Sequence, residues 1–481
     1  MTSTPLRAMS RSLVVSAAAV ALAVLLLGSW AFAAPHGAVG EVDELLVRIW
    51  CEETDFERCA EPIGPSAVDA DARLVPERLL QQRCVQQDRA ASAACLDTGA
   101  MSGRMIPIVV TAAEGVRGMP ELYVRLHGGA VTGDVDASLA RIRLVNVGLF
   151  LAVVSFAFVV AGPRVRPMMI ATAVPLVPLG LALIVSLDPV AWTLTGASVT
   201  LPMLLTILGP ESHGRRVAAG AVALVGALLL LTPPAQPPNR AAPLLALIGV
   251  IILAQQVTSR AHADERTIAA FALVVLVLLS SVVRSLLPAP FLHPASDAAL
   301  RGLAEDGPQF LGRATLALTI MLTVAALVML AGLRRQGPFG WVLFGAAATV
   351  GSILAVGTDV DAISTSTVGP DVFLPTLVVL VGVATLTRST TGPLLPGRAA
   401  HLLAGVVTVA HAFALRGRID RFVAPVDDRG GWPLRVEWWW DIPVGPDLVW
   451  VVGSLAMAGL AVLATPHLTE ERSNPVPEVV R

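Results

Sequence analysis

The sequence has little charge and few aromatic side chains. Only 15% of its 481 residues are charged and 5% are aromatic, whereas 55% are hydrophobic. A soluble chain of this length needs a more polar surface, so the surplus apolar residues are expected to face lipid. The formal net charge of −2 argues against a nucleic-acid partner, since such proteins usually carry a basic face. The Gly-rich phosphate loop of the Walker type is also missing.

Cysteine is rare and confined to one hydrophilic segment. An even number of cysteines in such a segment predicts disulfides in an oxidising compartment. Free thiols or a cytoplasmic metal site are the alternatives, but no Cys-x-x-Cys spacing supports zinc, so no metal is predicted. All three pairings stay open. The four cysteines, all between the first and second apolar runs, are Cys51, Cys59, Cys84 and Cys95.

Long apolar runs dominate the rest of the chain. A span needs about 20 apolar residues, and the runs predict an all-α polytopic membrane protein with about twelve transmembrane helices. The first run exceeds the apolar core of a signal peptide, which favours an uncleaved helix. The predicted spans are 13–34, 144–162, 168–187, 192–209, 217–232, 241–257, 267–287, 314–333, 339–357, 372–387, 399–415 and 447–465.

Arginines alternate from loop to loop, and this bias predicts the orientation. Both termini are expected in the cytoplasm of a cell with an inner (plasma) membrane, and the long loop after the first span is expected outside. The predicted regions are a cytoplasmic N-terminus (1–12), the first span (13–34), an extracytoplasmic loop domain with the four cysteines (35–142), the remaining spans (143–465) with external loops at 288–313 and 416–446, and a cytoplasmic tail (466–481).

Two acids just past the first span are the first candidate for chemistry. Asp43 and Glu44 would stand at the membrane boundary, where partial desolvation raises the pKa of a carboxylate towards that of a useful base. The alternative is a solvated first helical turn, where acids suit the helix dipole.

The last external loop supplies a second candidate. Arg416, Arg418 and Arg421 would lie at the membrane boundary, where guanidinium groups can hold a lipid phosphate through paired hydrogen bonds. Trp438 opens a run of three tryptophans that either forms an interfacial belt or stacks on a sugar ring.

Several short motifs occur in a recognisable order along the chain. After the acidic pair come a Val-Pro segment followed by two cysteines (74–95), the stretch MPELY (119–123), the sequence RLVN that opens the second span (143–146), and the turn SLDPVAW (186–192). In this order the chain resembles a family of bacterial membrane proteins known only as domain of unknown function family 2142, which is related to the glycosyltransferase C superfamily.

The resemblance implies a glycosyltransferase C-like fold and an enzyme that takes a sugar from a polyprenyl-phosphate donor outside the membrane. It implies that Asp43 and Glu44 are the catalytic residues and supply the base, that the arginines bind the lipid phosphate, and that Tyr123, Asp188 and Trp438 contact substrate. The chain departs from the family pattern at Val47, Met119 and Ile419, which replace a His and two Tyr residues. These departures predict either a shifted specificity or a catalytically silent member of the family.

Three functions therefore remain open. The sequence favours a polyprenyl-phosphate-sugar-dependent glycosyltransferase of cell-envelope polysaccharide assembly, with membrane lipid, the lipid-linked sugar and a glycan acceptor as partners. A non-catalytic subunit of an envelope-synthesis complex would explain the departures. A lipid or solute transporter would suit twelve spans but should show internal repeats. No cofactor is predicted, although some superfamily members use a divalent metal ion.

Overall fold

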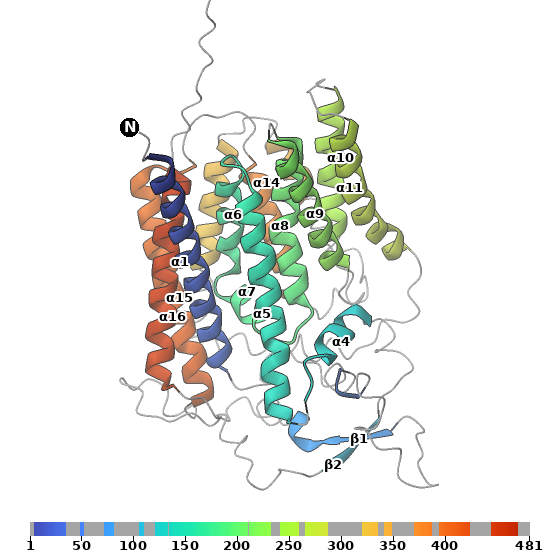
Figure 1. Ribbon diagram of the computed structural model, residues 1–481, viewed down its shortest axis with the longest axis vertical. Coiled ribbons are helices and arrows are strands. Elements are labelled where there is room, and N and C mark those ends of the chain that lie inside the picture. The colour runs from blue at the N-terminus through green and yellow to red at the C-terminus, as the bar shows by residue number, and fades with distance from the viewer. Residues whose placement is uncertain are drawn as a thin grey trace, which may run out of the picture.

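The computed structural model describes residues 4–34, 49–51, 72–80, 105–109, 121–132, 134–209, 211–231, 241–258, 265–286, 320–334, 341–348, 370–386, 394–423 and 444–469. They form a bundle of helices with a small two-stranded sheet and a short helix at one end (Figure 1). The helices are α1 (Thr4–Phe32), α4 (Glu121–Gly128), α5 (Val135–Val160), α6 (Arg166–Ala173), α7 (Leu179–Ile184), α8 (Val190–Leu208), α9 (His213–Leu231), α10 (Ala241–Thr258), α11 (Glu265–Leu286), α14 (Pro370–Ala384), α15 (Gly397–Val423) and α16 (Pro446–Thr469).

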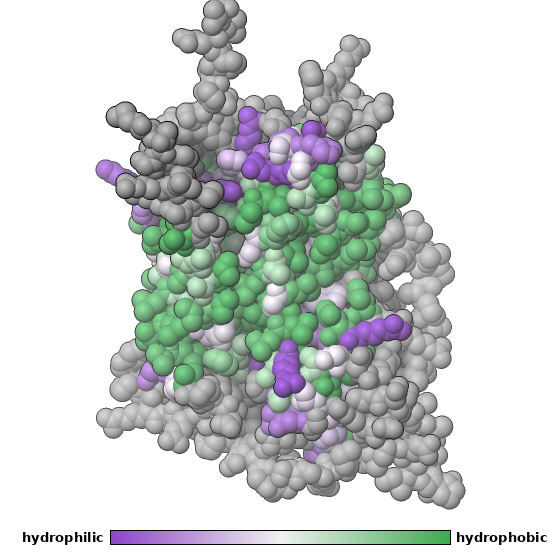
Figure 2. Space-filling model, viewed as in Figure 1, coloured by the Kyte–Doolittle hydropathy of each residue, from purple (hydrophilic) through white to green (hydrophobic). Residues whose placement is uncertain are grey.

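Six of the described helices are long and apolar enough to cross a membrane. Figure 2 shows an apolar belt between two more polar ends. The prediction of a helical membrane protein is thus confirmed, while the total of twelve spans stays a prediction. The six segments are Val14–Phe32, Val135–Val160, Val190–Leu208, His213–Leu231, Gly397–Asp420 and Pro446–Thr469, and shorter apolar helices cover Ala241–Ile252, Ile320–Arg334 and Leu374–Ala384.

One predicted span is wrong as a continuous helix. The run 168–187 is divided into α6, the 3-10 helix η4 (Val174–Leu176) and α7. Pro175 and Pro178 stand at the break, and proline removes a helical hydrogen bond and clashes with the preceding turn. Irregular backbone is tolerated at membrane depth where protein covers it, and both prolines are buried here.

The directions of α1, α15 and α16 place the two ends of the chain. A Cβ on Gly459 would meet Leu22, and one on Gly453 would meet Ser29, so α16 runs antiparallel to α1. Because α15 and α16 form a hairpin (Figure 1), α15 runs in the same direction as α1. Thr4 and Thr469 therefore lie at one end of the bundle, the termini end. The chain that follows α1 begins at the opposite end, the loop end.

A small sheet at the loop end adds to the expected all-α fold. Strand β1 (Ala72–Pro76) pairs antiparallel with β2 (Met105–Val109), with Ala72 opposite Val109 and Pro76 opposite Met105. The 3-10 helix η1 (Glu77–Leu80) follows β1. Val75 and Leu79 are buried in one apolar cluster with Tyr123 and Trp192, so the sheet region packs on the same core as α4 and the start of α8.

Helix α8 is the centre of the bundle. Of its most apolar window, 89% is buried inside the protein, against 22–39% for the other five candidate spans. Its hydroxyl groups turn back onto their own helix: Ser198 donates to the carbonyl of Leu194, and Thr206 to that of Pro202. These side chains therefore meet their hydrogen-bonding needs locally and leave the helix surface apolar for packing.

Candidate functional site at the loop end

Four buried polar or aromatic side chains form a cluster where α4 meets α5 and α8. We name it the Asn146 cluster, and it consists of Tyr123, His127, Asn146 and Trp192. The rings of Tyr123 and His127 stack with centroids 3.9 Å apart, and those of Tyr123 and Trp192 lie 4.9 Å apart. The cluster joins a helix of the loop region to two membrane helices.

Asn146 is the hub of this cluster. Trp192 Nε1 donates to its Oδ1 at 3.0 Å, and its own Nδ2 donates to the carbonyl of Ser186 at 2.7 Å. These two bonds fix the orientation of the amide, because a flipped amide would face a donor with a donor. The hydroxyl of Tyr123 donates to the carbonyl of Leu187 at 2.6 Å. The turn between α7 and α8 is thereby tied to α4 and α5.

His127 has an oxygen acceptor at each ring nitrogen. Its Nδ1 lies 2.8 Å from the carbonyl oxygen of Tyr123, and its Nε2 lies 3.0 Å from Oδ1 of Asn146. A neutral ring carries one proton and so makes one of these bonds. Burial nevertheless lowers the pKa of His127, although both hydrogen bonds partly offset that effect.

We expect the docking of α4 to weaken as the pH falls below about 6.5, the ordinary pKa of histidine. The folded protein disfavours protonation of His127, whereas the unfolded chain does not. The contribution of neutral His127 to stability is therefore fully present above that pH and decreases below it. The slope is at most about 1.4 kcal/mol per pH unit. Protection factors of the α4 amides, which correct the exchange rates for the intrinsic rate at each pH, measure it between pH 8 and 5, and His127→Gln should flatten their pH profile. Lower protection at high pH than at low pH would contradict the stated direction.

Arg143 fixes the end of α1. It is 2% exposed, and its Nε donates to the carbonyl of Val185 at 2.9 Å. Its Nη1 lies 3.3 Å from the carbonyl oxygen of Ala31 and 3.5 Å from that of Ala34. The last carbonyls of a helix lack partners within the helix, so a guanidinium group caps α1 at the point where the long loop begins.

A second polar group lies between α1, α15 and α16 at the same end. Arg416 is buried, and its Nε lies 3.1 Å from Asp420 Oδ1. Its Nη1 lies 3.2 Å from Oδ1 of Asp447. A buried cation needs such partners because its removal from water is costly. The charge of Arg416 is thus matched by two carboxylates.

Arg418 lies beside the end of α1. Its Cζ stands 5.5 Å from the centre of the Trp30 ring, within the range of a cation–π contact. The indole Nε1 of Trp30 donates to Nε2 of His411 at 2.8 Å. This contact brings α15 against the last turn of α1.

Some of the predicted site residues lie in the described parts of the chain, and others lie outside them. Tyr123 is buried and Asp188 is half-buried, with Asp188 Oδ1 accepting from the backbone N–H of Val190. Cys51 is buried and is not a free thiol, but the predicted disulfides stay a prediction. Arg421 belongs to α15, and its side chain is not described. The predicted residues outside the described parts are Asp43, Glu44, Cys59, Cys84, Cys95 and Trp438.

Sequence reasoning missed His127 and the roles of Asn146 and Arg143. A signal existed for the last two, because Arg143 directly precedes the apolar run of the second span and Asn146 interrupts it, and polar groups there need partners. His127 gave no such signal, since it lies in a polar segment. Within the described residues, no group of three His, Cys, Asp or Glu side chains is placed to hold a metal ion.

No family model, no curated protein and no solved structure matches the chain. The fold and the site therefore define a class only, a helical membrane protein with a buried polar cluster and paired arginines at one end.

Proposed function

We propose that the protein is a glycosyltransferase of cell-envelope polysaccharide assembly that uses a polyprenyl-phosphate-linked sugar at its loop end. The observation that supports this most is the contact between Arg418 and Trp30. It brings the arginine-rich end of α15 to the end of α1. Asp43 follows nine residues after Ala34, so the chain length keeps it within about 30 Å of that helix end.

The proposed chemistry divides between the acids and the arginines. Asp43 or Glu44 would take the proton from an acceptor hydroxyl, whose oxygen then bonds to the anomeric carbon of the sugar. The bond from that carbon to the phosphate oxygen breaks, and its electron pair leaves with the lipid phosphate. Arg418, with Arg421, would stabilise the negative charge on that phosphate. A divalent metal ion is not needed for this proton balance.

The proposal includes the membrane and the orientation. We place the protein in the inner (plasma) membrane with about twelve spans, a glycosyltransferase C-like fold and both termini in the cytoplasm. Cytoplasmic loops of membrane proteins carry an excess of basic residues. The termini end carries several arginines that support this orientation, among them Arg164, Arg215 and Arg398. The loop end then faces outwards, where lipid-linked sugars serve as donors and the four cysteines can form disulfides.

A non-catalytic subunit of an envelope-synthesis complex is the second candidate. The observation in its favour is the pairing of Arg416 with Asp420 and Asp447. A guanidinium group already matched by two carboxylates has less charge to offer a phosphate, and a buried pair of this kind serves structure. Under this alternative the loop end binds a partner protein, and Asp43 and Glu44 transfer no proton in a reaction.

Deletion of the gene, followed by complementation, separates the two candidates. We expect one envelope sugar to disappear in the deletion strain and to return with the wild-type gene. The variant Asp43→Asn with Glu44→Gln should leave that sugar reduced by about 100-fold or more, the usual contribution of a general base. The readout is the sugar composition of the envelope at equal membrane abundance of the proteins.

The next acids in the same loop provide a matched control. Glu52→Gln with Glu53→Gln removes the same two charges a few residues further on, and it should restore the sugar fully. Full restoration by the Asp43 and Glu44 variant would contradict the catalytic role and favour the non-catalytic subunit.

A further inference from the structure

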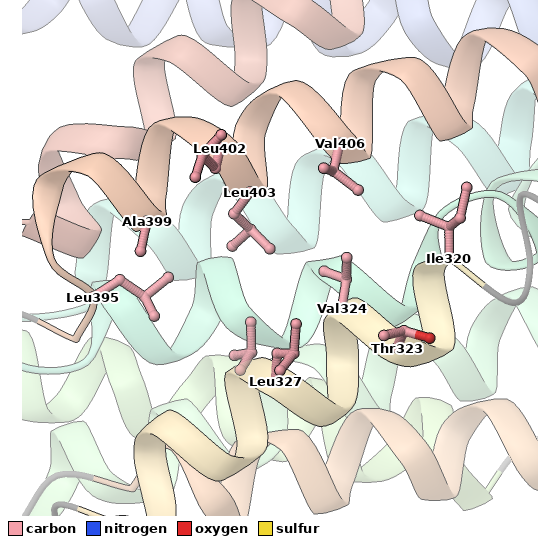
Figure 3. A pocket seen from close by; sticks show the side chains of 10 residues that line it. Ile320, Thr323, Val324, Leu327, Leu395, Ala399, Leu402, Leu403 and Val406 are labelled. Atoms are coloured by element: carbon pink, nitrogen blue, oxygen red, sulfur yellow. The ribbon is translucent and has the colours of Figure 1, made fainter.

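A groove lies between the helix Ile320–Arg334 and α15. Its volume is about 540 Å³, within the range of about 300–1,000 Å³ that small-molecule sites occupy. Apolar side chains line it, and Thr323 is the one hydroxyl among the lining residues. The lining residues are Ile320, Thr323, Val324, Leu327, Val328, Leu395, Ala399, Leu402, Leu403 and Val406 (Figure 3).

The groove opens towards the lipid. Leu402 is 71% exposed and Leu327 is 58% exposed, whereas Val324 and Val328 are buried. The rims of the groove are thus apolar side chains at the outer surface, and its floor belongs to the packed core. In a membrane, such a cleft meets hydrocarbon chains and not water.

The directions of the two helices show which end of the groove lies at the termini end of the bundle. In Figure 3, α15 runs from Ala399 to Val406, and the other helix runs from Ile320 beside Val406 towards Leu327 beside Leu395. Because α15 begins at the termini end, the part of the groove near Leu395 also lies at that end.

Two exposed arginines stand at this end of the groove. Arg398 directly precedes the lining residue Ala399, and Arg334 ends the opposite helix. Within the part of the chain that the structure describes, neither forms an ion pair, unlike Arg215 with Glu211 at the same end of the molecule. The groove is therefore apolar along its length and cationic at its mouth.

We propose that this groove binds an anionic phospholipid from the leaflet at the termini end. One hydrocarbon chain lies along Val324 and Leu403, and the phosphate is held by Arg398 and Arg334. Guanidinium groups suit phosphate because they donate two hydrogen bonds at once, and basic pockets between membrane helices on the cytoplasmic side bind anionic headgroups. A partner helix brings no negative charge to the arginines by itself, whereas an anionic lipid supplies both a hydrocarbon chain and a phosphate. A lipid fits both features of the site.

Lipid binding to the purified full-length protein tests the proposal. Native mass spectrometry would count bound phosphatidylglycerol and phosphatidylcholine with identical chains. Wild type should prefer the anionic lipid, and Arg334→Gln with Arg398→Gln should reduce that preference by roughly five-fold for each arginine. Ala399→Phe fills the groove and should reduce retention of both lipids.

Two control variants keep the result specific. Arg215→Gln removes an exposed arginine at the same end, and Ala152→Phe enlarges an exposed alanine on α5. Both should bind lipid as wild type does. Equal binding of the two lipids by wild type would overturn the proposal. If the arginine changes reduce lipid binding and Ala399→Phe does not, the lipid is attracted to the charged surface in general. That result would overturn the proposal that it binds in the groove. A co-purified polypeptide in place of lipid would assign the groove to a protein partner instead.

Discussion

Asn146→Leu should destabilise the protein by about 3 kcal/mol, because it leaves several buried polar groups without partners. Trp192 Nε1 and the carbonyl of Ser186 would both lose a hydrogen bond of 3.0 Å or less. Leucine has the same branching and the same number of side-chain heavy atoms as asparagine, but its methyl groups are bulkier, so the change removes polarity and also crowds the buried site. Hydrogen bonds between membrane helices average only about 0.6 kcal/mol each, and the larger expected value comes from the unpaired groups that remain.

Unfolding in detergent, together with hydrogen exchange of α4, measures this effect. Exchange should rise across Glu121–Gly128 and stay unchanged in α15 and α16, which contribute no residue to the Asn146 cluster. Ser198→Ala is the matched control, since that hydroxyl bonds only to its own helix and should cost less than about 1 kcal/mol. Equal losses for the two variants would show that the cluster has no special role.

Gly196→Ala should weaken the contact between α8 and α9 by about 3 kcal/mol, the upper part of the usual cost of overpacking. A Cβ at this position would lie 2.5 Å from the carbonyl oxygen of Gly226 and 2.7 Å from Cγ of Leu230. The first of these atoms belongs to the backbone, which cannot rotate away. The two helices would have to move apart, and α8 is the most buried span in the bundle.

The control for this change has the opposite expected sign. A Cβ at Gly220, on the same helix as Gly226, would meet no atom within 4 Å. Gly220→Ala should therefore stabilise α9 by about 0.5–1 kcal/mol, the usual preference of a helix interior for alanine. Thermal unfolding of the two variants at equal detergent concentration compares them. Similar behaviour of both would mean that α8 and α9 are not held at this close distance.

The apolar runs predicted the helices well because a membrane imposes a minimum length on any span. The same criterion missed the break in 168–187, since hydropathy counts proline only as one more residue and its effect is on backbone geometry. Pro175 and Pro178 were visible in the sequence. Whether they would bend a helix or divide it depended on the buried surroundings.

The site was less predictable because its partners are distant in the chain. Arg143 bonds to a carbonyl 42 residues away and to another 112 residues away, and periodicity within one segment carries no information on such pairs. The arginines of α15 were identified from their position at the end of a span. Their pairing with Asp420 and Asp447 required the helix hairpin to be known.

The most direct test of the proposed reaction uses the purified protein in nanodiscs. It would receive a polyprenyl-phosphate-linked sugar together with envelope glycan isolated from the deletion strain, and the release of free polyprenyl phosphate would be followed over time. We expect release that depends on the glycan, a loss of about 100-fold or more in the Asp43→Asn and Glu44→Gln variant, and full activity in the Glu52→Gln and Glu53→Gln control. Release that is unchanged in the first variant, or no release from a folded wild-type protein with the sugar that the deletion strain lacks, would contradict the glycosyltransferase proposal.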